Sequence, residues 1–442
     1  MALVTPANVH ETLNRWLLAD GLAVVCDLEK SQGAYLHDAL SDRDYLDFFS
    51  FFAARPLGFN HPKMRSPAFV DYLGRIALHK PSNCDLYTVE YARFVETFAT
   101  VALGRDFRHV FFIEGGSPAV ENALKAAFDW KVRKNIAAGR GIKGSKVISF
   151  KEAFHGRTGY ALSITDSADK RKSEYFPRFA WPRVINPKMR FPFDAAALAE
   201  TVALEEQAVA AINAAIDQEP DEVAAIIIEP IQGEGGDNYF RSEFLRTLRE
   251  ICDERECLLI FDEIQTGFGA TGKWWDWQNH GVKPDLMVFG KKTQVCGFAA
   301  TDRLDEVDSV FKVASRISST FEGNLVDMVR SERVIEIIVE DKLLDNAVTI
   351  GKYLLKLLRE QATQRAEVAN VRGRGLWAAF DLPTTDDRDR LIKACFDEEL
   401  LVIPCGLRSI RLRPALDIGA DAVGRAVAQL EAAIRRAFGR KS

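Results

Sequence analysis

The 442-residue sequence predicts an α/β fold, with a mostly parallel sheet in a large domain and a smaller α+β domain after it. Three observations support this prediction. Short apolar runs recur without alternating polar residues, segments with a helical pattern separate these runs, and the pattern changes near Phe321. Apolar strands that are separated by helices are typical of a parallel sheet covered on both faces.

The middle of the chain supplies the predicted sheet and its covering helices. Amphipathic helices are expected over residues 118–136 and 241–256, because apolar residues recur there at helical spacing. Pro230 ends one of the strands, since proline cannot donate to a sheet. The expected strands are HVFFIEGG from His109, KVISF from Lys146, VAAIIIEP from Val223, CLLIFDE from Cys257 and DLMVFGKK from Asp285.

The expected order of helices and strands changes in the last third of the chain. Long helices are expected over 324–340 and 343–362, followed by strands over 371–382 and 401–414 and a final helix over 422–439. We therefore predict three parts. Residues 1–55 form an N-terminal segment that packs with the small domain, 56–320 form the large ligand-binding domain, and 321–442 form the small C-terminal domain.

Composition narrows the class of protein. A formal charge of -5 and a pI near 5.9 give no reason to expect nucleic acid or a membrane as a partner. Seven cysteines without a C-x-x-C pair are expected to be free thiols in a reducing cytoplasm. No apolar run reaches the roughly 18 residues of a membrane span, and the N-terminus lacks a signal-peptide pattern. We expect a soluble cytoplasmic protein, and we predict no metal site.

Polar residues at the ends of the predicted strands are the candidates for a binding site, because ligands of open α/β sheets collect there. Each candidate alone has an ordinary structural explanation: a glycine turn, an aromatic pair in the core, a helix cap or a surface lysine. The candidates are Glu114-Gly115-Gly116-Ser117, Phe154-His155-Gly156, Asp262 with Gln265, and Gly290-Lys291-Lys292.

Together, these groups are what pyridoxal phosphate requires. Glycines at the start of a helix accept a phosphate, and an aromatic ring can stack on the cofactor. A lysine forms a Schiff base with the aldehyde, and an acid keeps the ring nitrogen protonated so that the ring can act as an electron sink. We therefore interpret Asp262 as the residue that pairs with the cofactor cation.

The motifs also resemble those of the class III (subgroup II) aminotransferases, which have the aspartate-aminotransferase fold, or fold type I of pyridoxal phosphate enzymes. The resemblance covers nearly the whole chain and implies the same fold here. The motifs that carry it are FFIEGGSPAVENALKAA, AFHGRTGYALSIT, IIIEPIQGEGG, LLIFDEIQTGFGATG, KPDLMVFGKK and SSTFEGN.

The resemblance implies a role for individual residues. In this family the Schiff-base lysine lies six residues after the aspartate of a Pro-Asp pair, which selects Lys291 over Lys292. Thr320 is implied to reach the phosphate of the partner subunit, so a homodimer with composite active sites is expected. The other implied cofactor contacts are Gly116 and Ser117 at the phosphate, Phe154 and His155 beside the ring, Asp262 at the ring nitrogen and Gln265 near the ring hydroxyl.

Within this family, the runs KPSNCDLYT, EPIQGEGGDNYFR and FGKKTQVCGF resemble the enzymes that act on the terminal amine of L-lysine. The resemblance implies ping-pong transfer of that amine to 2-oxoglutarate, giving L-glutamate and 2-aminoadipate 6-semialdehyde. 4-Aminobutyrate or another ω-amine stays open as the donor, because 4-aminobutyrate aminotransferases also tend to carry the Lys-Lys pair. A catalytically silent cofactor-binding or scaffold protein is a further alternative, which the joint presence of Lys291, Asp262, Glu234 and Arg411 disfavours.

The two substrates differ beside the reacting carbon, where 2-oxoglutarate has a carboxylate and lysine has a methylene. An arginine that binds the first would be left unpaired by the second, which is unfavourable in a buried site. The resemblance assigns Arg411 as the carboxylate-binding arginine and Glu234 as a switch that pairs with it while lysine reacts. Arg157 is predicted to hold the distal carboxylate, with a structural role as the alternative, and Arg413 is expected to be a surface or domain-contact residue.

Overall fold

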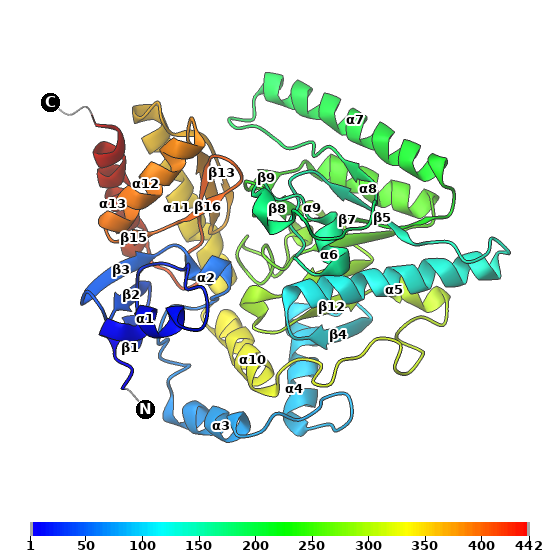
Figure 1. Cartoon of the computed structure of the whole chain (residues 1–442), viewed down its shortest axis with the longest axis horizontal. Helices are drawn as coiled ribbons and strands as arrows, with labels where there is room; N and C mark the ends of the chain where they lie inside the picture. Colours follow the sequence, from blue (N-terminus) through cyan, green and yellow to red (C-terminus); the bar gives the residue numbers. More distant parts are fainter. Residues whose placement is uncertain (1–2, 440–442) are drawn as a thin grey trace.

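The structure is a computed structural model that describes residues 3–439. A seven-stranded sheet and its helices form one lobe, and the N-terminal strands lie beside the C-terminal elements in the other (Figure 1). The predicted α/β fold with a mostly parallel sheet is confirmed. The limits of the three parts, at residues 55 and 320, stay a prediction.

The large sheet has the strand order β4-β12-β11-β10-β7-β5-β6. Only β12 runs antiparallel, to both β11 and β4. The five strands expected from apolar runs are present as β4, β5, β7, β10 and β11. The bounds are β4 (His109–Ile113), β12 (Cys296–Ala300), β11 (Leu286–Phe289), β10 (Leu258–Asp262), β7 (Val223–Ile228), β5 (Lys146–Phe150) and β6 (Arg183–Val184).

Both faces of this sheet are buried, which explains why its strands read as continuous apolar runs. Along β10, Leu259 and Phe261 join one hydrophobic core, while Leu258 and Ile260 join a second core on the opposite face. Successive side chains of a strand point to opposite faces, so a strand between two layers of helices has no position for a polar residue until it ends.

Helices cover the two faces. α5 (Gly116–Ala137) contributes its alanine-rich side to the core that contains Leu258, and α8 (Ser242–Glu254) packs on the face of Phe261. The small side chains of α5 allow a close approach to the sheet. The other elements of this part are α3 (Pro67–Ala77), α4 (Val89–Thr97), the π-helical turn η2 (Phe98–Ala102), α6 (Gly159–Ile164), η3 (Lys170–Lys172), α7 (Ala195–Gln218), α9 (Trp277–His280), η4 (Lys291–Thr293) and η5 (Asp302–Glu306).

Two smaller sheets complete the second lobe. One has the order β13-β14-β17-β16, and the other joins β1, β2 and β3 to β15, so that residues near both ends of the chain share a sheet. The strands are β1 (Cys26–Gln32), β2 (Tyr35–Asp38), β3 (Arg43–Asp47), β13 (Ala369–Arg374), β14 (Trp377–Asp381), β15 (Leu400–Leu401), β16 (Ile403–Cys405) and β17 (Ser409–Leu412). The helices are η1 (Pro6–Asn8), α1 (Val9–Asn14), α2 (Ser50–Ala53), α10 (Leu325–Glu340), α11 (Leu343–Gln364), α12 (Thr385–Asp397) and α13 (Ala420–Phe438).

Three features were not expected from the sequence. They are the long helix α7, the antiparallel strand β12, and the hairpin of β8 (Ile231–Gln232) and β9 (Asn238–Tyr239), whose turn contains Glu234. All seven cysteines are free thiols. Within residues 3–439, no helix is long and apolar enough to cross a membrane.

Candidate active site

The predicted site residues gather at the carboxyl edge of the large sheet. Because β4, β5, β10 and β11 are parallel, the segments that follow them emerge at the same edge. Asp262 is the last residue of β10, and the turn after β11 contains Lys291. The sheet therefore brings together groups that lie up to 175 residues apart in the sequence, from Gly116 to Lys291.

Asp262 is fixed in one orientation by two hydrogen bonds. Its Oδ2 accepts from Nδ1 of His155 at 2.8 Å, and its Oδ1 accepts from the main-chain N–H of Ile264 at 3.1 Å. Both side chains are buried, and Nε2 of His155 has no hydrogen-bond partner among the described residues. A buried polar atom without a partner is uncommon in a native protein and indicates a place for a ligand or water.

Lys291 and Lys292 have different surroundings. Lys291 is half-buried. Its burial and the nearby Arg411 guanidinium lower the pKa of its amine to about 8, although the carboxylates of Asp262 and Glu229 act to raise it. Lys292 is buried, and its Nζ donates to the main-chain oxygen of Gln265 at 3.3 Å. An amine that attacks an aldehyde must be reachable and neutral, which favours Lys291.

The backbone of Lys291 is strained. Its φ of 56° lies in the left-handed region, which costs a residue with a side chain about 1–2 kcal/mol. Such strain persists only where the surrounding structure enforces it, and it is concentrated at functional sites. The strained residue follows the end of β11, next to β10 whose last residue is Asp262.

The start of α5 offers an anion site. Its N-cap, Gly115, provides no side-chain cap, so the first N–H groups of a 22-residue helix stay available. Ser117 Oγ lies 2.7 Å from Oγ1 of Thr158, which in turn donates to Glu121. A Cβ at Gly156 would lie 2.2 Å from Ser117 Oγ, so the loop after β5 can approach this helix only because residue 156 is glycine.

Glu229, at the end of β7, is a site residue that the sequence reasoning missed. Its carboxylate accepts from the N–H of Phe154 at 2.9 Å and from the N–H of Gly233 at 3.0 Å, and so joins two loops of the site. Burial raises the pKa of Glu229 to about 7, and the nearby Asp262 adds to this rise. The signal was available, because Glu229 follows a buried strand just as Asp262 does.

Arg411 reaches this edge from β17 of the other lobe. It is buried, its Nη1 donates to Oε1 of Gln265 at 2.9 Å, and its Nε has no hydrogen-bond partner among the described residues. The guanidinium therefore has capacity to bind a carboxylate from a ligand.

Glu234 does not pair with Arg411 in this structure. Its Oε1 accepts from Nζ of Lys172 at 2.5 Å and from Oγ of Ser167 at 2.9 Å. The predicted pairing of Glu234 with Arg411 is therefore not seen in this structure, and the switch role of Glu234 stays a prediction. Lys172 and Ser167 were not predicted, and nothing in their local sequence points to this contact.

Two predicted residues lie at the surface of the described chain. Arg157, directly after the buried His155 loop, is exposed, and Thr320 is exposed in the segment before α10. The main-chain oxygen of Thr320 accepts from the thiol of Cys84 at 3.6 Å. Their roles stay predictions.

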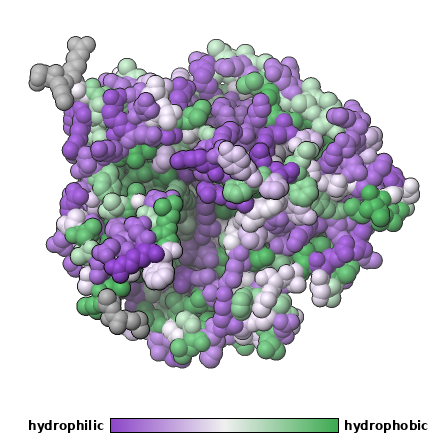
Figure 2. Space-filling view, in the orientation of Figure 1, coloured by the Kyte–Doolittle hydropathy of each residue, from purple (hydrophilic) through white to green (hydrophobic). Residues whose placement is uncertain are grey.

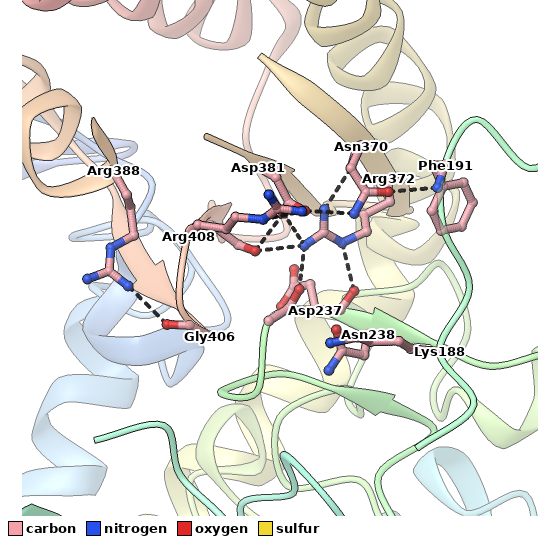
Figure 3. Close-up of polar contacts among 12 residues, drawn as sticks. Lys188, Phe191, Asp237, Asn238, Asn370, Arg372, Asp381, Arg388, Gly406 and Arg408 are labelled. Carbon is pink, nitrogen blue, oxygen red and sulfur yellow. Dashed lines mark hydrogen bonds and ion pairs between the residues drawn. The ribbon is translucent and has the colours of Figure 1, made fainter. Parts of the chain in front are cut away.

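Contacts between the two lobes brace the backbone around Glu234. Arg372 of β13 donates from Nε to the main-chain oxygen of Asp237 at 2.9 Å, and its Nη2 binds the oxygen of Gly236 (Figure 3). The N–H of Gly406 donates to the main-chain oxygen of Glu234 at 2.7 Å. Arg413 is not at the surface: it is buried in this contact, where its Nη2 lies 2.5 Å from Oδ1 of Asp237.

A cleft of about 560 Å³ lies beside this contact, lined by residues of both lobes such as Glu152, Gly236, Arg372 and Arg408. None of the predicted site residues lines it in the described chain, and its Arg372 and Asp381 pair with one another at 2.8 Å. Figure 2 shows the face of Figure 1, where mostly polar residues surround a hollow between the lobes.

The residues at the sheet edge fit pyridoxal phosphate. A reachable amine with a lowered pKa, a fixed carboxylate and an uncapped helix start supply the aldehyde, ring-nitrogen and phosphate contacts that this cofactor needs. Nε2 of His155 and Nε of Arg411 have no hydrogen-bond partner among the described residues, which is consistent with a ligand in this site.

Comparisons with known proteins agree with this interpretation. Residues 19–434 match the family model of class-III aminotransferases. The L-lysine-epsilon aminotransferase of Mycobacterium tuberculosis is 49% identical over 434 residues, which cover 97% of this chain and 96% of that protein. A solved structure of lysine aminotransferase from M. tuberculosis in the internal aldimine form has 48% identity and a TM-score of 0.96, covering 98% of this chain and 100% of that one. A probable mitochondrial 4-aminobutyrate aminotransferase of Caenorhabditis elegans is 32% identical, covering 88% of this chain and 83% of that protein. The chain belongs to the class III aminotransferases and is a pyridoxal phosphate-dependent enzyme.

Proposed function

We propose that the protein transfers the terminal amine of L-lysine to 2-oxoglutarate, giving L-glutamate and 2-aminoadipate 6-semialdehyde. The observation that carries the choice of donor is the 49% identity, over 97% of the chain, to an L-lysine-epsilon aminotransferase. We also propose a cytoplasmic homodimer with composite sites, in which the exposed Thr320 reaches the phosphate of the partner subunit.

Bound pyridoxal phosphate supplies an electron sink for the carbon that carries the reacting amine. Lys291 would attach the cofactor through its ε-amine and, when released, would carry the proton at that carbon. Asp262, held by His155, would pair with the ring nitrogen. Gly116 and Ser117 would hold the phosphate at the start of α5, with Phe154 beside the ring and Gln265 near its hydroxyl.

The polar side of the site recognises the two substrates in turn. Arg411 binds the carboxylate beside the reacting carbon of 2-oxoglutarate or glutamate, using guanidinium N–H groups that do not bond to Gln265. When L-lysine binds, that carbon has only a methylene beside it, so the Glu234 carboxylate pairs with Arg411 instead. The exposed Arg157 holds the distal carboxylate in both half-reactions.

The position of the reacting amine tests the function. The ε-amine of lysine yields a semialdehyde that cyclises and forms a coloured adduct with 2-aminobenzaldehyde. We expect this adduct when purified enzyme, L-lysine and 2-oxoglutarate are combined. The α-keto acid of lysine as the product, with no coloured adduct, would contradict the proposal.

4-Aminobutyrate is the second candidate donor, because a relative with that name is 32% identical. Assaying a panel of ω-amines with 2-oxoglutarate separates the two. L-lysine should have the highest kcat/KM, and a higher value for 4-aminobutyrate would replace the assignment.

The roles of Glu234 and Arg411 are tested by following each half-reaction through the cofactor absorbance in stopped flow. Glu234→Ala should slow the lysine half-reaction far more than the glutamate half-reaction, since only lysine then leaves Arg411 unpaired. Arg411→Ala should do the reverse. Equal losses in both half-reactions for Glu234→Ala would leave that residue a structural acid.

A further inference from the structure

The Glu234 carboxylate is held in this structure by two side chains other than Arg411. Nζ of Lys172 lies 2.5 Å from Oε1 of Glu234, and Oγ of Ser167 donates to the same oxygen at 2.9 Å. Both side chains of the ion pair are half-buried, so water screens the pair only in part. Lys172 ends the short helix η3 (Lys170–Lys172), and its Nζ lies 5.8 Å from the centre of the Phe154 ring.

Only the side chain of Glu234 is free to move between its lysine and arginine partners. Its main-chain oxygen is held by Gly406, and the main-chain oxygens of Gly236 and Asp237 are held by Arg372. A Cβ at Gly235 would lie 2.1 Å from the main-chain oxygen of Glu152, so this turn is packed tightly. Because the backbone of this turn is fixed, a change of partner by the Glu234 carboxylate has to come from rotation of its side chain.

We propose that Lys172, with Ser167, holds the Glu234 carboxylate away from Arg411 and thereby sets the preference of the site for 2-oxoglutarate and glutamate over lysine. This inference rests on the proposed function, in which Glu234 is the switch. Lys172 and Arg411 compete for one carboxylate. A stronger ion pair between Lys172 and Glu234 leaves Arg411 free to bind the carboxylate of the dicarboxylic substrate more of the time. Glu234 then pairs with Arg411, as lysine binding requires, less of the time.

Lys172 is a positioning residue in this scheme, because it acts through Glu234 and touches no reacting atom. Lys172→Met keeps the length of the side chain and removes its charge. Losing one half-buried, charge-assisted hydrogen bond should weaken the binding of dicarboxylates by about five- to tenfold. Binding of L-lysine should be unchanged or tighter, since Glu234 then pairs with Arg411 more of the time.

The experiment measures the dissociation constant of glutarate, an unreactive dicarboxylate, by calorimetry on the holoenzyme, together with the Michaelis constants for both substrates. In Lys172→Met, the dissociation constant of glutarate and the Michaelis constant for the keto acid should rise together, while kcat and the Michaelis constant for lysine stay near the wild-type values. Lys172→Arg should restore glutarate binding. Arg171→Met is the matched control, because Arg171 lies on the same turn, is 85% exposed and, within residues 3–439, forms its ion pair only with Asp169.

A double variant separates this inference from the proposed function. In a Glu234→Ala background, adding Lys172→Met should change glutarate binding no further. If Glu234→Ala is selective for the lysine half-reaction but Lys172→Met binds glutarate like the wild type, the switch stands and the Lys172 anchor is wrong. If Lys172→Met weakens glutarate and lysine equally, or adds to Glu234→Ala, its effect does not pass through Glu234 and the inference is overturned. A wild-type enzyme that is inactive on lysine would instead overturn the proposed function itself.

Discussion

Two sides of the same site are built in different ways. The cofactor side, with Asp262, His155 and Lys291, comes from loops at the carboxyl edge of one sheet, and Asp262 is locked by two hydrogen bonds. The carboxylate side, with Arg411, Glu234 and Lys172, is assembled from three separate elements in two lobes. In the described residues, Arg411 contacts Gln265, whereas Glu234 contacts Lys172 and Ser167.

This difference follows from what each side does. The cofactor stays the same in both half-reactions, so a fixed geometry serves it throughout, and preorganised charges need no rearrangement. The substrates differ in charge beside the reacting carbon, so one fixed arrangement would leave a buried charge unpaired with one of them. Changes on the cofactor side should therefore affect both half-reactions alike, whereas changes on the carboxylate side should separate them.

The largest effect is expected for Lys291→Ala. Removing a residue that anchors the cofactor and moves the proton should lower kcat by at least about 10²–10⁴-fold, in both half-reactions. The variant should still bind pyridoxal phosphate, seen by its absorbance after gel filtration. Borohydride reduction of the wild type and peptide mass spectrometry should place the cofactor on Lys291, and an adduct on Lys292 would show that the register is wrong.

Asp262→Asn should lower kcat by roughly 10²–10³-fold, the size of effect seen when one preorganised charge at a reacting group is removed. Because the ring nitrogen needs its proton in both directions, stopped-flow rates with lysine and with glutamate should fall by the same factor. A loss confined to one substrate would break the distinction between the two sides. Far-UV circular dichroism serves as the folding control.

The lowered pKa of Lys291 gives a prediction about pH. In apoenzyme, the amine is charged below about pH 8 and neutral above it, and only the neutral form attacks an aldehyde. The rate at which apoenzyme captures pyridoxal phosphate should therefore rise about tenfold per pH unit up to about 8 and then level off. A rise that continues to the ordinary pKa of lysine, 10.5, would show that the amine is not desolvated. The rate is followed by the absorbance of the bound cofactor.

The smallest effect is expected for Lys292→Met. Lys292 is buried and bonded to a main-chain oxygen rather than facing Asp262, and a swap of similar volume should cost less than about 1.5 kcal/mol of stability. Burial lowers the pKa of the Lys292 amine well below its ordinary value. The variant should keep its cofactor on Lys291 and transaminate both substrates, and loss of the cofactor would contradict the separate roles of the two lysines.

The sequence by itself determined the cofactor side. Apolar runs without alternation locate the strands, and ligands collect where such strands end, so the sequence pattern makes Asp262 and the Lys291-Lys292 pair candidates. The resemblance to the class III aminotransferases then selects Lys291 of the two lysines. The same logic applied to VAAIIIEP would have found Glu229, whose carboxylate joins two loops of the site. Glu229 was missed although the rule that ligands collect at strand ends applies to it.

Only the tertiary structure decided which groups contact Arg411 and Glu234 on the carboxylate side. Lys172 lies 62 residues from Glu234 on a short helical turn, and no periodicity links the two. Arg411 and Gln265 are 146 residues apart, and Arg372 reaches the turn after Glu234 across the contact between the lobes. The pattern of a strand indicates its burial and its position along the chain. The partner of a charged side chain depends instead on how the two lobes pack together and on which other charged groups lie nearby.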